Sequence, residues 1–261
     1  LKVDSDGFVN LDQLKNMISD NTLVVSIIMA NNEIGTIQNI KEISKICDQA
    51  RTYLHVDAVQ AVCHTNLDLK ELNVDLLSIS AHKFHGPKGV GFLYVNHQFK
   101  ITPFINGGAQ ERNMRGGTEN VPGIVGLAKA LETCYSEMEL HQKIIMELKD
   151  YMREQLTFQI PGIEFNGETS HDKSLYTVLN CRFPHHPDAE MVLFNLDIAG
   201  IAASGGSACS SGSNQGSHVL RGLGIDMSKA SVRFSFCKYN TKKEIDSVIE
   251  VLKEIFTKKI N

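Results

Sequence analysis

Apolar residues in the first part of the chain follow two patterns, helical spacing and short continuous runs. Apolar positions three or four apart predict helices at residues 11–18 and 40–50, with Asn10 and the Asn39/Glu42 pair as N-terminal caps. The continuous runs predict strands, and the first of them, rich in β-branched residues, predicts a strand buried on both faces. Strand, helix, strand in this order indicates an α/β fold with a mostly parallel sheet. The predicted strands are residues 23–28, 53–57, 75–80 and 90–95, and residues 2–9 predict a further strand interrupted by a turn.

The second half of the chain begins with a long helical pattern and then changes character. Residues 119–156 predict one long helix or two consecutive helices, with a possible break at Pro122 and Gly123. The elements that follow predict a smaller α+β domain, so we expect a large domain at 1–135 and a small domain at 136–261. They are strands 175–181 and 231–236, a helix at 189–197, a Ser/Gly-rich loop at 203–217, and a last helix capped by Thr241 and Glu244.

Composition and charge narrow the classes of protein. The 261 residues are 42% hydrophobic and 21% charged, which is ordinary globular composition. The net charge of −4, with both signs interspersed, argues against nucleic acid or an anionic membrane as the main partner, and no apolar run reaches the ~18 residues of a membrane span. The six cysteines include no CxxC pair, so we expect a reducing, cytoplasmic setting.

Polar residues follow three of the predicted strands, where ligand sites of α/β sheets occur. They are Asn31, Asn32 and Glu33 after the first strand, Asp57 and Gln60 after the second, and Ser80, His82 and Lys83 after the third. A lysine and a carboxylate at neighbouring strand ends suit pyridoxal phosphate (PLP): the amine forms a Schiff base and the carboxylate keeps the pyridine nitrogen protonated. Ser80 and His82 flank the lysine as donors to a phosphate. This order of clusters favours a cofactor lysine at position 83 over a solvated surface lysine.

Other kinds of site fit the sequence less well. The run GPKGVG lacks the GxxxxGK[ST] pattern and precedes a strand, which disfavours a phosphate-binding P-loop. His55 is expected to be a packed or hydrogen-bonded core histidine. We expect no metal site, because CxxxHH is no standard zinc spacing. The residues that raise the metal hypothesis are Cys181, His185, His186 and Asp188.

Seven motifs resemble, in order, those of bacterial cysteine desulfurases, which are NifS-like PLP enzymes of fold type I in the class V aminotransferase group. They are NNEIGTIQ, HVDAVQ, SAHKFHGPKGVG, RGGTEN, SGGSACSSGS, HVLRGLG and VRFSF. The match runs from about residue 24 to the end of the chain, and the ordered set is more specific than any single motif. The resemblance implies a PLP-dependent transferase-like large domain with a mostly parallel sheet, followed by a smaller α+β domain.

The resemblance also implies residue roles. It places Arg233 at the substrate carboxylate together with Asn32, and a planar bidentate donor suits that task. The alternative for Arg233 is a salt bridge within the sheet. The implied cofactor ligands are Lys83 at the Schiff base, Asp57 at the pyridine nitrogen, Asn32 and Gln60 near the ring, Ser80 and His82 at the phosphate, and Thr118 at the phosphate of the other subunit of a homodimer.

Cys209 lies in the small, polar, glycine-rich run SGGSACSSGSNQGS, which predicts an exposed and mobile loop. This context favours a nucleophile over a small buried hydrophobe. In the reaction that the resemblance implies, the Cys209 thiolate attacks the sulfur of L-cysteine, leaving alanine and a Cys209 persulfide. His82 is then a candidate for proton transfer. The sulfur would pass to an acceptor protein such as an iron–sulfur scaffold, and would serve the synthesis of iron–sulfur clusters or of thiolated tRNA.

Members of the family begin with a portion of about a hundred residues that carries a Gly/Thr phosphate loop and a histidine stacked on the cofactor. Neither motif occurs in this chain, so we expect weak or absent PLP binding and activity from this polypeptide alone. Three alternative functions stay open. They are a selenocysteine lyase, a class V aminotransferase, and a non-catalytic scaffold or dimerisation fragment.

Overall fold

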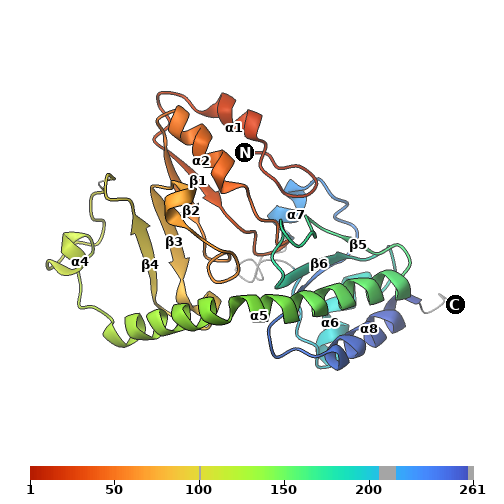
Figure 1. The fold of residues 1–261 in the computed structure, drawn as a ribbon. Coiled ribbons are helices and arrows are strands. Elements are labelled where there is room, and N and C mark those ends of the chain that lie inside the picture. The colour runs from red at the N-terminus through yellow and green to blue at the C-terminus, as the bar shows by residue number, and fades with distance from the viewer. Residues whose placement is uncertain (100, 206–215, 258–261) are drawn as a thin grey trace. The chain divides into compact units, whose positions relative to one another are not determined.

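The computed structural model describes residues 1–99, 101–205 and 216–257 (Figure 1). The chain divides into two compact units, each described here by itself. The parallel-sheet unit comprises Lys15–Met29 and Asn39–Met138. The C-terminal unit comprises Leu1–Leu14, Ala30–Gln38 and Glu139–Asn261. In the part of the chain that the structure describes, no helix is both long and apolar enough to cross a bilayer.

The parallel-sheet unit contains a four-stranded sheet in the order β1-β2-β3-β4. The first three strands are parallel and β4 is antiparallel to β3, which confirms the predicted mostly parallel sheet. The helices between the parallel strands are the crossovers that a parallel sheet requires. The strands are β1 (Val24–Ile28), β2 (Tyr53–Asp57), β3 (Leu76–Ser80) and β4 (Gly91–Val95), and the crossover helices are α2 (Ile40–Gln49) and α3 (Leu69–Leu72).

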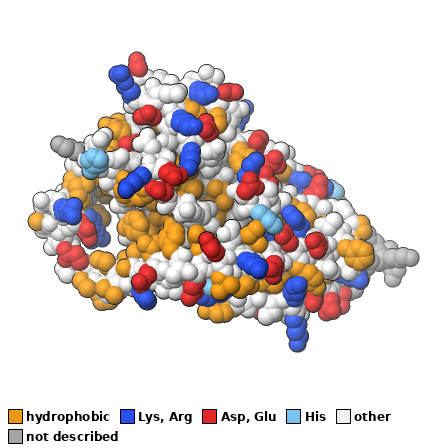
Figure 2. All heavy atoms as spheres, viewed as in Figure 1, with side chains coloured by type: hydrophobic (Ala, Val, Ile, Leu, Met, Phe, Trp, Pro, Cys, Tyr) orange, Lys and Arg blue, Asp and Glu red, His pale blue; other side chains and the backbone are white. Residues whose placement is uncertain are grey.

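Strand β1 corrects one expectation. Val25 and Ile27 are buried, but Val24 and Ile28 are 44% and 51% exposed, so one face of the strand is covered and the other is not. The run of β-branched residues was expected to be buried on both faces, and that is wrong for the described chain. The uncovered face contributes to the exposed hydrophobic side chains of this protein, a class that Figure 2 shows in orange. A continuous apolar run fixes strand formation but not what packs against each face.

The C-terminal unit is built on an antiparallel sheet in the order β5-β6-β7. One face of this sheet carries alternate apolar residues such as Leu179 and Phe234, which join a core with the helices. The opposite face carries polar residues, among them Asn180 and Arg233, which are register partners. The strands are β5 (Glu164–Phe165), β6 (Val178–Arg182) and β7 (Ser231–Ser235), and the helical elements are η2 (Ala189–Met191), α6 (Val192–Ile198), α7 (His218–Gly222) and α8 (Lys242–Thr257).

Helix α5 (Val121–Gln159) is a single element of 39 residues, so of the two predicted alternatives the one long helix is correct and no break occurs at Pro122. Proline is tolerated there because the first turn of a helix needs no backbone donor at that position. The predicted capping box of the last helix is confirmed. Thr241 N donates to Glu244 Oε2 at 2.7 Å, and Glu244 N donates to Thr241 Oγ1 at 3.3 Å.

The remaining short elements lie outside both sheets. Helix α1 (Leu11–Met17) begins where predicted, and Gln13 N donates to Asn10 Oδ1 at 2.8 Å. The strand expected at residues 2–9 is reduced to a single bridge between Val3 and Val9. The other two elements are the 3₁₀ helix η1 (Ala81–Phe84) and α4 (Gln110–Asn113).

The two compact units do not follow the predicted domains at every segment. The break at Met138 lies close to the predicted boundary, but two N-terminal segments group with the C-terminal unit. Hydrogen bonds explain this grouping, because Leu175 N donates to Gly35 O at 2.8 Å and Ile37 N donates to Lys173 O at 2.9 Å. The domain assignment 1–135 and 136–261 therefore stays a prediction.

A buried lysine in the C-terminal unit is expected to make the stability of the fold depend on pH. Lys149 of α5 is 4% exposed, and its Nζ donates to Ser174 Oγ at 2.9 Å and to Leu175 O at 2.8 Å. Burial, and then the nearby Arg153, lower the pKa of Lys149 from 10.5 to about 8. Between these two pH values the unfolded chain binds a proton at Lys149 that the folded chain lacks, so the contribution of Lys149 to stability rises with pH across that window. Below this pH window Lys149 is charged in the folded state, and burying that charge lowers the free energy of unfolding by on the order of 3 kcal/mol.

We therefore expect Lys149→Met to remove this rise. The free energy of unfolding, measured with denaturant on the two sides of the window, should increase with pH in the wild type more than in the variant. Lys143→Met on the exposed face of the same helix is the control, and its pH profile should match the wild type. A Lys149→Met profile parallel to the wild type would show that the buried amine does not set the dependence.

Candidate functional site

The structure places Lys83 in a short turn that follows β3. Ala81 and Phe84 of η1 are fully buried, whereas His82 and Lys83 between them are exposed. The two buried residues fix the turn to the core, because a fully buried aromatic side chain can occupy few alternative positions. The sequence AHKF therefore holds a polar pair, His82 and Lys83, on an anchored backbone at the end of a strand.

The residues after Lys83 close the turn. His85 adopts a left-handed conformation with φ of 67°, and Gly86 N donates to Ala81 O at 2.9 Å. A Cβ atom on residue 86 would lie 2.8 Å from Ala81 Cβ and 2.9 Å from Ala81 O, which leaves room only for glycine. The glycine that follows KFH in the sequence is thus required by the fold of the turn.

Asp57 lies at the same edge of the sheet as the Lys83 turn. It is the last residue of β2 and the register partner of Ser78 in the parallel neighbour β3. Parallel strands end at one edge, and this is the edge at which α/β sheets bind ligands. Asp57 Oδ1 accepts a hydrogen bond from Val59 N at 3.0 Å, which orients the carboxylate.

Ser80 and His82 lie at this edge with Asp57 and Lys83, and two further predicted residues, Gln60 and Thr118, lie in loops. Ser80 Oγ and His82 Nδ1 are 2.8 Å apart and hydrogen-bonded, so the hydroxyl and the imidazole orient each other. Gln60 lies half-buried in the turn three residues after Asp57. Thr118 lies exposed in the loop before α5, next to a Gly116–Gly117 turn that is tied to Ile105 by a hydrogen bond of 2.9 Å. The structure thus brings Asp57, Ser80, His82 and Lys83 to one edge.

His64 was not predicted as a site residue, and it forms a hydrogen bond with the backbone of Lys83. Burial, and then the nearby His85, lower the pKa of His64 to about 4, and a hydrogen bond with the Lys83 backbone opposes the shift. His64 is therefore a neutral imidazole at neutral pH. Only its place, a few residues after the HVDAVQ motif, could have drawn attention to it.

His55 bridges three strands of the parallel sheet. Its Nδ1 lies 2.8 Å from Ser26 Oγ of β1, and its Nε2 lies 3.2 Å from Ser78 Oγ of β3. The predicted hydrogen-bonded role is confirmed, but the ring is partly exposed rather than part of the core. Ser78 is also the register partner of Asp57, so this network supports the strand that presents the carboxylate.

The C-terminal unit holds the other predicted site residues. Arg233 Nη1 donates to the backbone carbonyl of Asn32 at 2.9 Å, and Arg233 Nε is buried without a partner among the described residues. Within that part of the chain the guanidinium bonds to a carbonyl and to no carboxylate, so the alternative of a salt bridge within the sheet is not supported. An arginine held by one nitrogen keeps other N–H groups available to a ligand.

Cys209 lies outside the described residues. Ser204 and Ser217, on either side of it, are described and form hydrogen bonds. Ser204 forms backbone hydrogen bonds of 2.7 and 3.2 Å with Arg233, and Ser217 caps helix α7. The predicted loop 203–217 is thus attached to β7 at one end and to α7 at the other.

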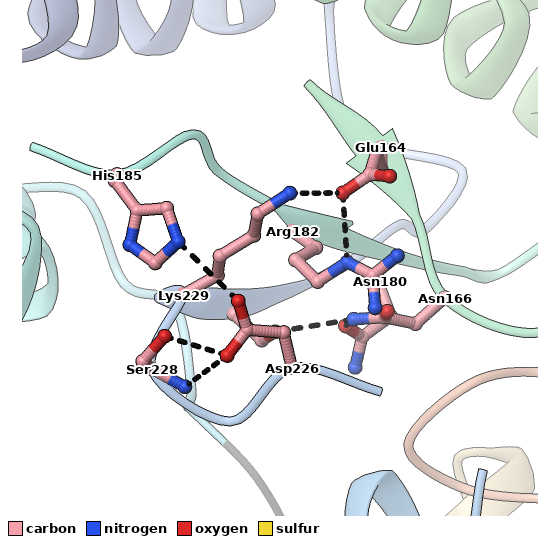
Figure 3. A network of polar contacts seen from close by, with 9 residues as sticks. Glu164, Asn166, Asn180, Arg182, His185, Asp226, Ser228 and Lys229 are labelled. Carbon is pink, nitrogen blue, oxygen red and sulfur yellow. Dashed lines mark hydrogen bonds and ion pairs between the residues drawn. The ribbon is translucent and has the colours of Figure 1, made fainter. Parts of the chain in front are cut away.

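The residues of the rejected zinc hypothesis have other environments. Cys181 is fully buried, which raises the pKa of its thiol, and His185 lies exposed with its Nε2 3.3 Å from Asp226 Oδ2 (Figure 3). His186 Nδ1 lies 3.8 Å from Asp188 Oδ2. In the ranges that the structure describes, no three or more His, Cys, Asp or Glu residues are grouped so as to hold a metal ion.

Comparison with known proteins identifies the family of this chain. The family model described as aminotransferase class-V matches residues 1–248. The chain is 46% identical over 260 residues to the protein named cysteine desulfurase IscS of Methanosarcina thermophila, and 45% identical over 260 residues to that of Dictyoglomus turgidum. These alignments cover 99% of this chain but 63% and 65% of the relatives, so the chain spans less than two thirds of their length.

Solved structures give the same result for the fold. A NifS-like protein superposes with a TM-score of 0.87 at 37% identity, and the match covers 98% of this chain and 67% of the NifS-like chain. The NifS-like protein of Rickettsia africae has a TM-score of 0.88 at 31% identity, covering 99% and 69%. A structure titled SspA in complex with cysteine has a TM-score of 0.75 at 30% identity, covering 92% and 66%. The fold is that of NifS-like PLP enzymes of fold type I, and the chain belongs to the class-V aminotransferase family.

Proposed function

We propose that this chain forms part of a PLP-dependent cysteine desulfurase. The observation that carries the proposal is the exposed Lys83 on its anchored turn, at the same sheet edge as the Asp57 carboxylate. The curated relatives at about 45% identity carry the name cysteine desulfurase, which supports the same reaction here. A scaffold protein would have no need of a lysine and a carboxylate at the ligand-binding edge.

The donors at this edge fit PLP. Lys83 would hold the cofactor covalently through Nζ, Asp57 would bind its pyridine nitrogen, and the Ser80–His82 pair would bind its phosphate. Gln60 and Asn32 are proposed near the ring, and Thr118 at the phosphate of the partner in a homodimer. Bound PLP supplies an electron sink that weakens bonds at the substrate amino acid.

We propose L-cysteine as the substrate. One solved relative is titled as a complex with cysteine, and Arg233 supplies a suitable group for the carboxylate of an amino acid. The Asn32 carbonyl fixes one guanidinium nitrogen, so the remaining N–H groups are oriented before a ligand arrives. His82, exposed and hydrogen-bonded to Ser80, is proposed to move protons at the substrate.

Cys209 is proposed as the residue that receives the sulfur, as a persulfide formed when alanine leaves. From there the sulfur would pass to an acceptor protein such as an iron–sulfur scaffold or toward thiolated tRNA, in a cytoplasmic setting. The rival functions differ in their needs. A selenocysteine lyase would act on L-selenocysteine with less help from Cys209, and an aminotransferase would ignore Cys209 and require a keto acid.

Arg233→Lys tests the substrate assignment. We expect the KM for L-cysteine to rise about 10- to 100-fold with a smaller change in kcat, because a point charge replaces a planar donor that can bind a carboxylate through two hydrogen bonds. Alanine formation against L-cysteine concentration measures both constants. Arg182→Lys is the matched control, since Arg182 lies on the neighbouring strand and pairs with Glu164 at 3.0 Å (Figure 3). An unchanged KM for Arg233→Lys would remove Arg233 from the substrate site.

A further inference from the structure

Glu33 is a fully buried carboxylate in the turn between β1 and α2. Its Oε2 accepts a hydrogen bond of 2.6 Å from Ser217 Oγ, and its Oε1 is buried without a partner among the described residues. Burying a carboxylate with one partner is costly, and a hydrophobic residue would fill the same volume at no electrostatic cost. The carboxylate therefore calls for an explanation beyond packing.

The partner of Glu33 is Ser217, the residue directly before helix α7. Ser217 is the N-cap of α7, and its Oγ accepts a hydrogen bond from Leu220 N at 3.1 Å. Because its hydroxyl hydrogen points to Glu33, the Ser217 oxygen is left to accept from the helix. Ile34, next to Glu33, packs against Leu220 of the same helix and Leu223 directly after it. Polar and apolar contacts thus join the Glu33 turn to α7.

Hydrogen bonds hold the backbone on both sides of Glu33, and one of them comes from the antiparallel sheet. Asn180 Nδ2 of β6 donates to Glu33 O at 3.0 Å. Asn180 is itself held by Asn166, whose Nδ2 donates to Asn180 Oδ1 at 2.8 Å in a buried hydrogen bond, and Figure 3 draws both residues. Glu33 N donates to Asn31 Oδ1 at 2.8 Å, which also fixes the peptide that precedes Glu33.

That preceding peptide connects Glu33 to Arg233. The Asn32 carbonyl and the Glu33 N–H belong to one planar unit, so one cannot turn without the other. The Asn32 carbonyl is the acceptor of Arg233 Nη1 at 2.9 Å. A rotation of Glu33 would therefore tilt the carbonyl that holds the guanidinium.

We propose that Glu33 is a positioning residue: through Ser217 and the Asn32–Glu33 peptide it holds helix α7 and the Arg233 guanidinium in fixed relation. This inference rests on the proposed function only where Arg233 binds the substrate carboxylate. The arrangement itself is a property of the C-terminal unit and is testable without cofactor or substrate.

The first arm of the test is structural. In the chain without cofactor, solvent exchange of the Arg233 Nε proton and the Leu220 amide is measured by nuclear magnetic resonance. We expect Glu33→Gln to speed both exchanges about fivefold, because a neutral acceptor binds Ser217 more weakly than a carboxylate does. Ser217→Ala should have a larger effect, and the double variant should match Ser217→Ala, since both changes remove one interaction. The control Glu250→Gln, exposed on α8, should leave both rates unchanged.

The second arm is kinetic and separates positioning from mere stabilisation. We expect Glu33→Gln to raise the KM for L-cysteine about fivefold while kcat changes less than about twofold. Unchanged exchange of the Arg233 Nε proton would overturn the inference, as would faster exchange with an unaltered KM in an active enzyme. If exchange responds as expected and the wild type forms no alanine, the positioning stands and the proposed function fails.

Discussion

Lys83→Ala is expected to abolish both the binding signal of PLP and the desulfurase reaction. In the wild type, bound cofactor should give an absorbance band near the edge of the visible range, because Lys83 Nζ attaches to it covalently. Alanine has no amine with which to hold the cofactor or to move a proton at the substrate. We expect alanine formation to fall by roughly 10³-fold or more, the scale of losing a positioned acid–base group.

The control for this experiment is Lys88→Ala, an exposed lysine in the same loop, which should keep the band. Both variants are measured with saturating PLP, with and without a second polypeptide that supplies the part of the curated relatives not matched by this chain. A band of normal strength from this chain alone would contradict the expectation of weak binding. A band that survives Lys83→Ala in either arrangement would contradict the assignment of Lys83.

Cys209→Ser is expected to leave the absorbance of bound PLP intact and to stop turnover. A serine hydroxyl is a far weaker nucleophile toward sulfur than a thiolate and cannot form a persulfide. We expect alanine formation from L-cysteine to fall by about 10²- to 10⁴-fold, the range for removing a positioned reactive group. Cys237→Ser, a half-buried cysteine of the same unit, should retain turnover.

The same variant separates the rival functions. A Cys209→Ser variant that still forms alanine from L-selenocysteine at the wild-type rate would favour a selenocysteine lyase. Turnover that depends on an added keto acid and ignores Cys209 would favour an aminotransferase. No cofactor band, even with the second polypeptide present, would favour a non-catalytic fragment.

Local patterns were sufficient to predict most of the secondary structure. The Thr241/Glu244 capping box and the β-branched runs act within a few residues, so the start of the last helix and the parallel strands could be read from the sequence. Burial on both faces of β1 could not, because exposure depends on which distant segments pack against each face. The grouping of Ala30–Gln38 with the C-terminal unit escaped prediction for the same reason.

The site was predictable to the extent that strand ends mark it. Asp57 and Lys83 were expected at one edge because parallel strands end together, and the register of β2 and β3 places them there. His64 was missed because its burial and its contact with the Lys83 backbone depend on the tertiary fold. Glu33 was noted as a polar residue without a role, since its partner Ser217 lies 184 residues away in the chain.

The most direct test of the proposed function is the mass of the peptide containing Cys209 after the protein has reacted with PLP and L-cysteine. The desulfurase assignment predicts the addition of one sulfur atom to Cys209, with alanine formed in equal amount. The reaction is run with the second polypeptide present, so that the full set of family elements is available. Alanine formed while Cys209 stays unmodified, or no alanine at all from this complete mixture, would contradict the assignment.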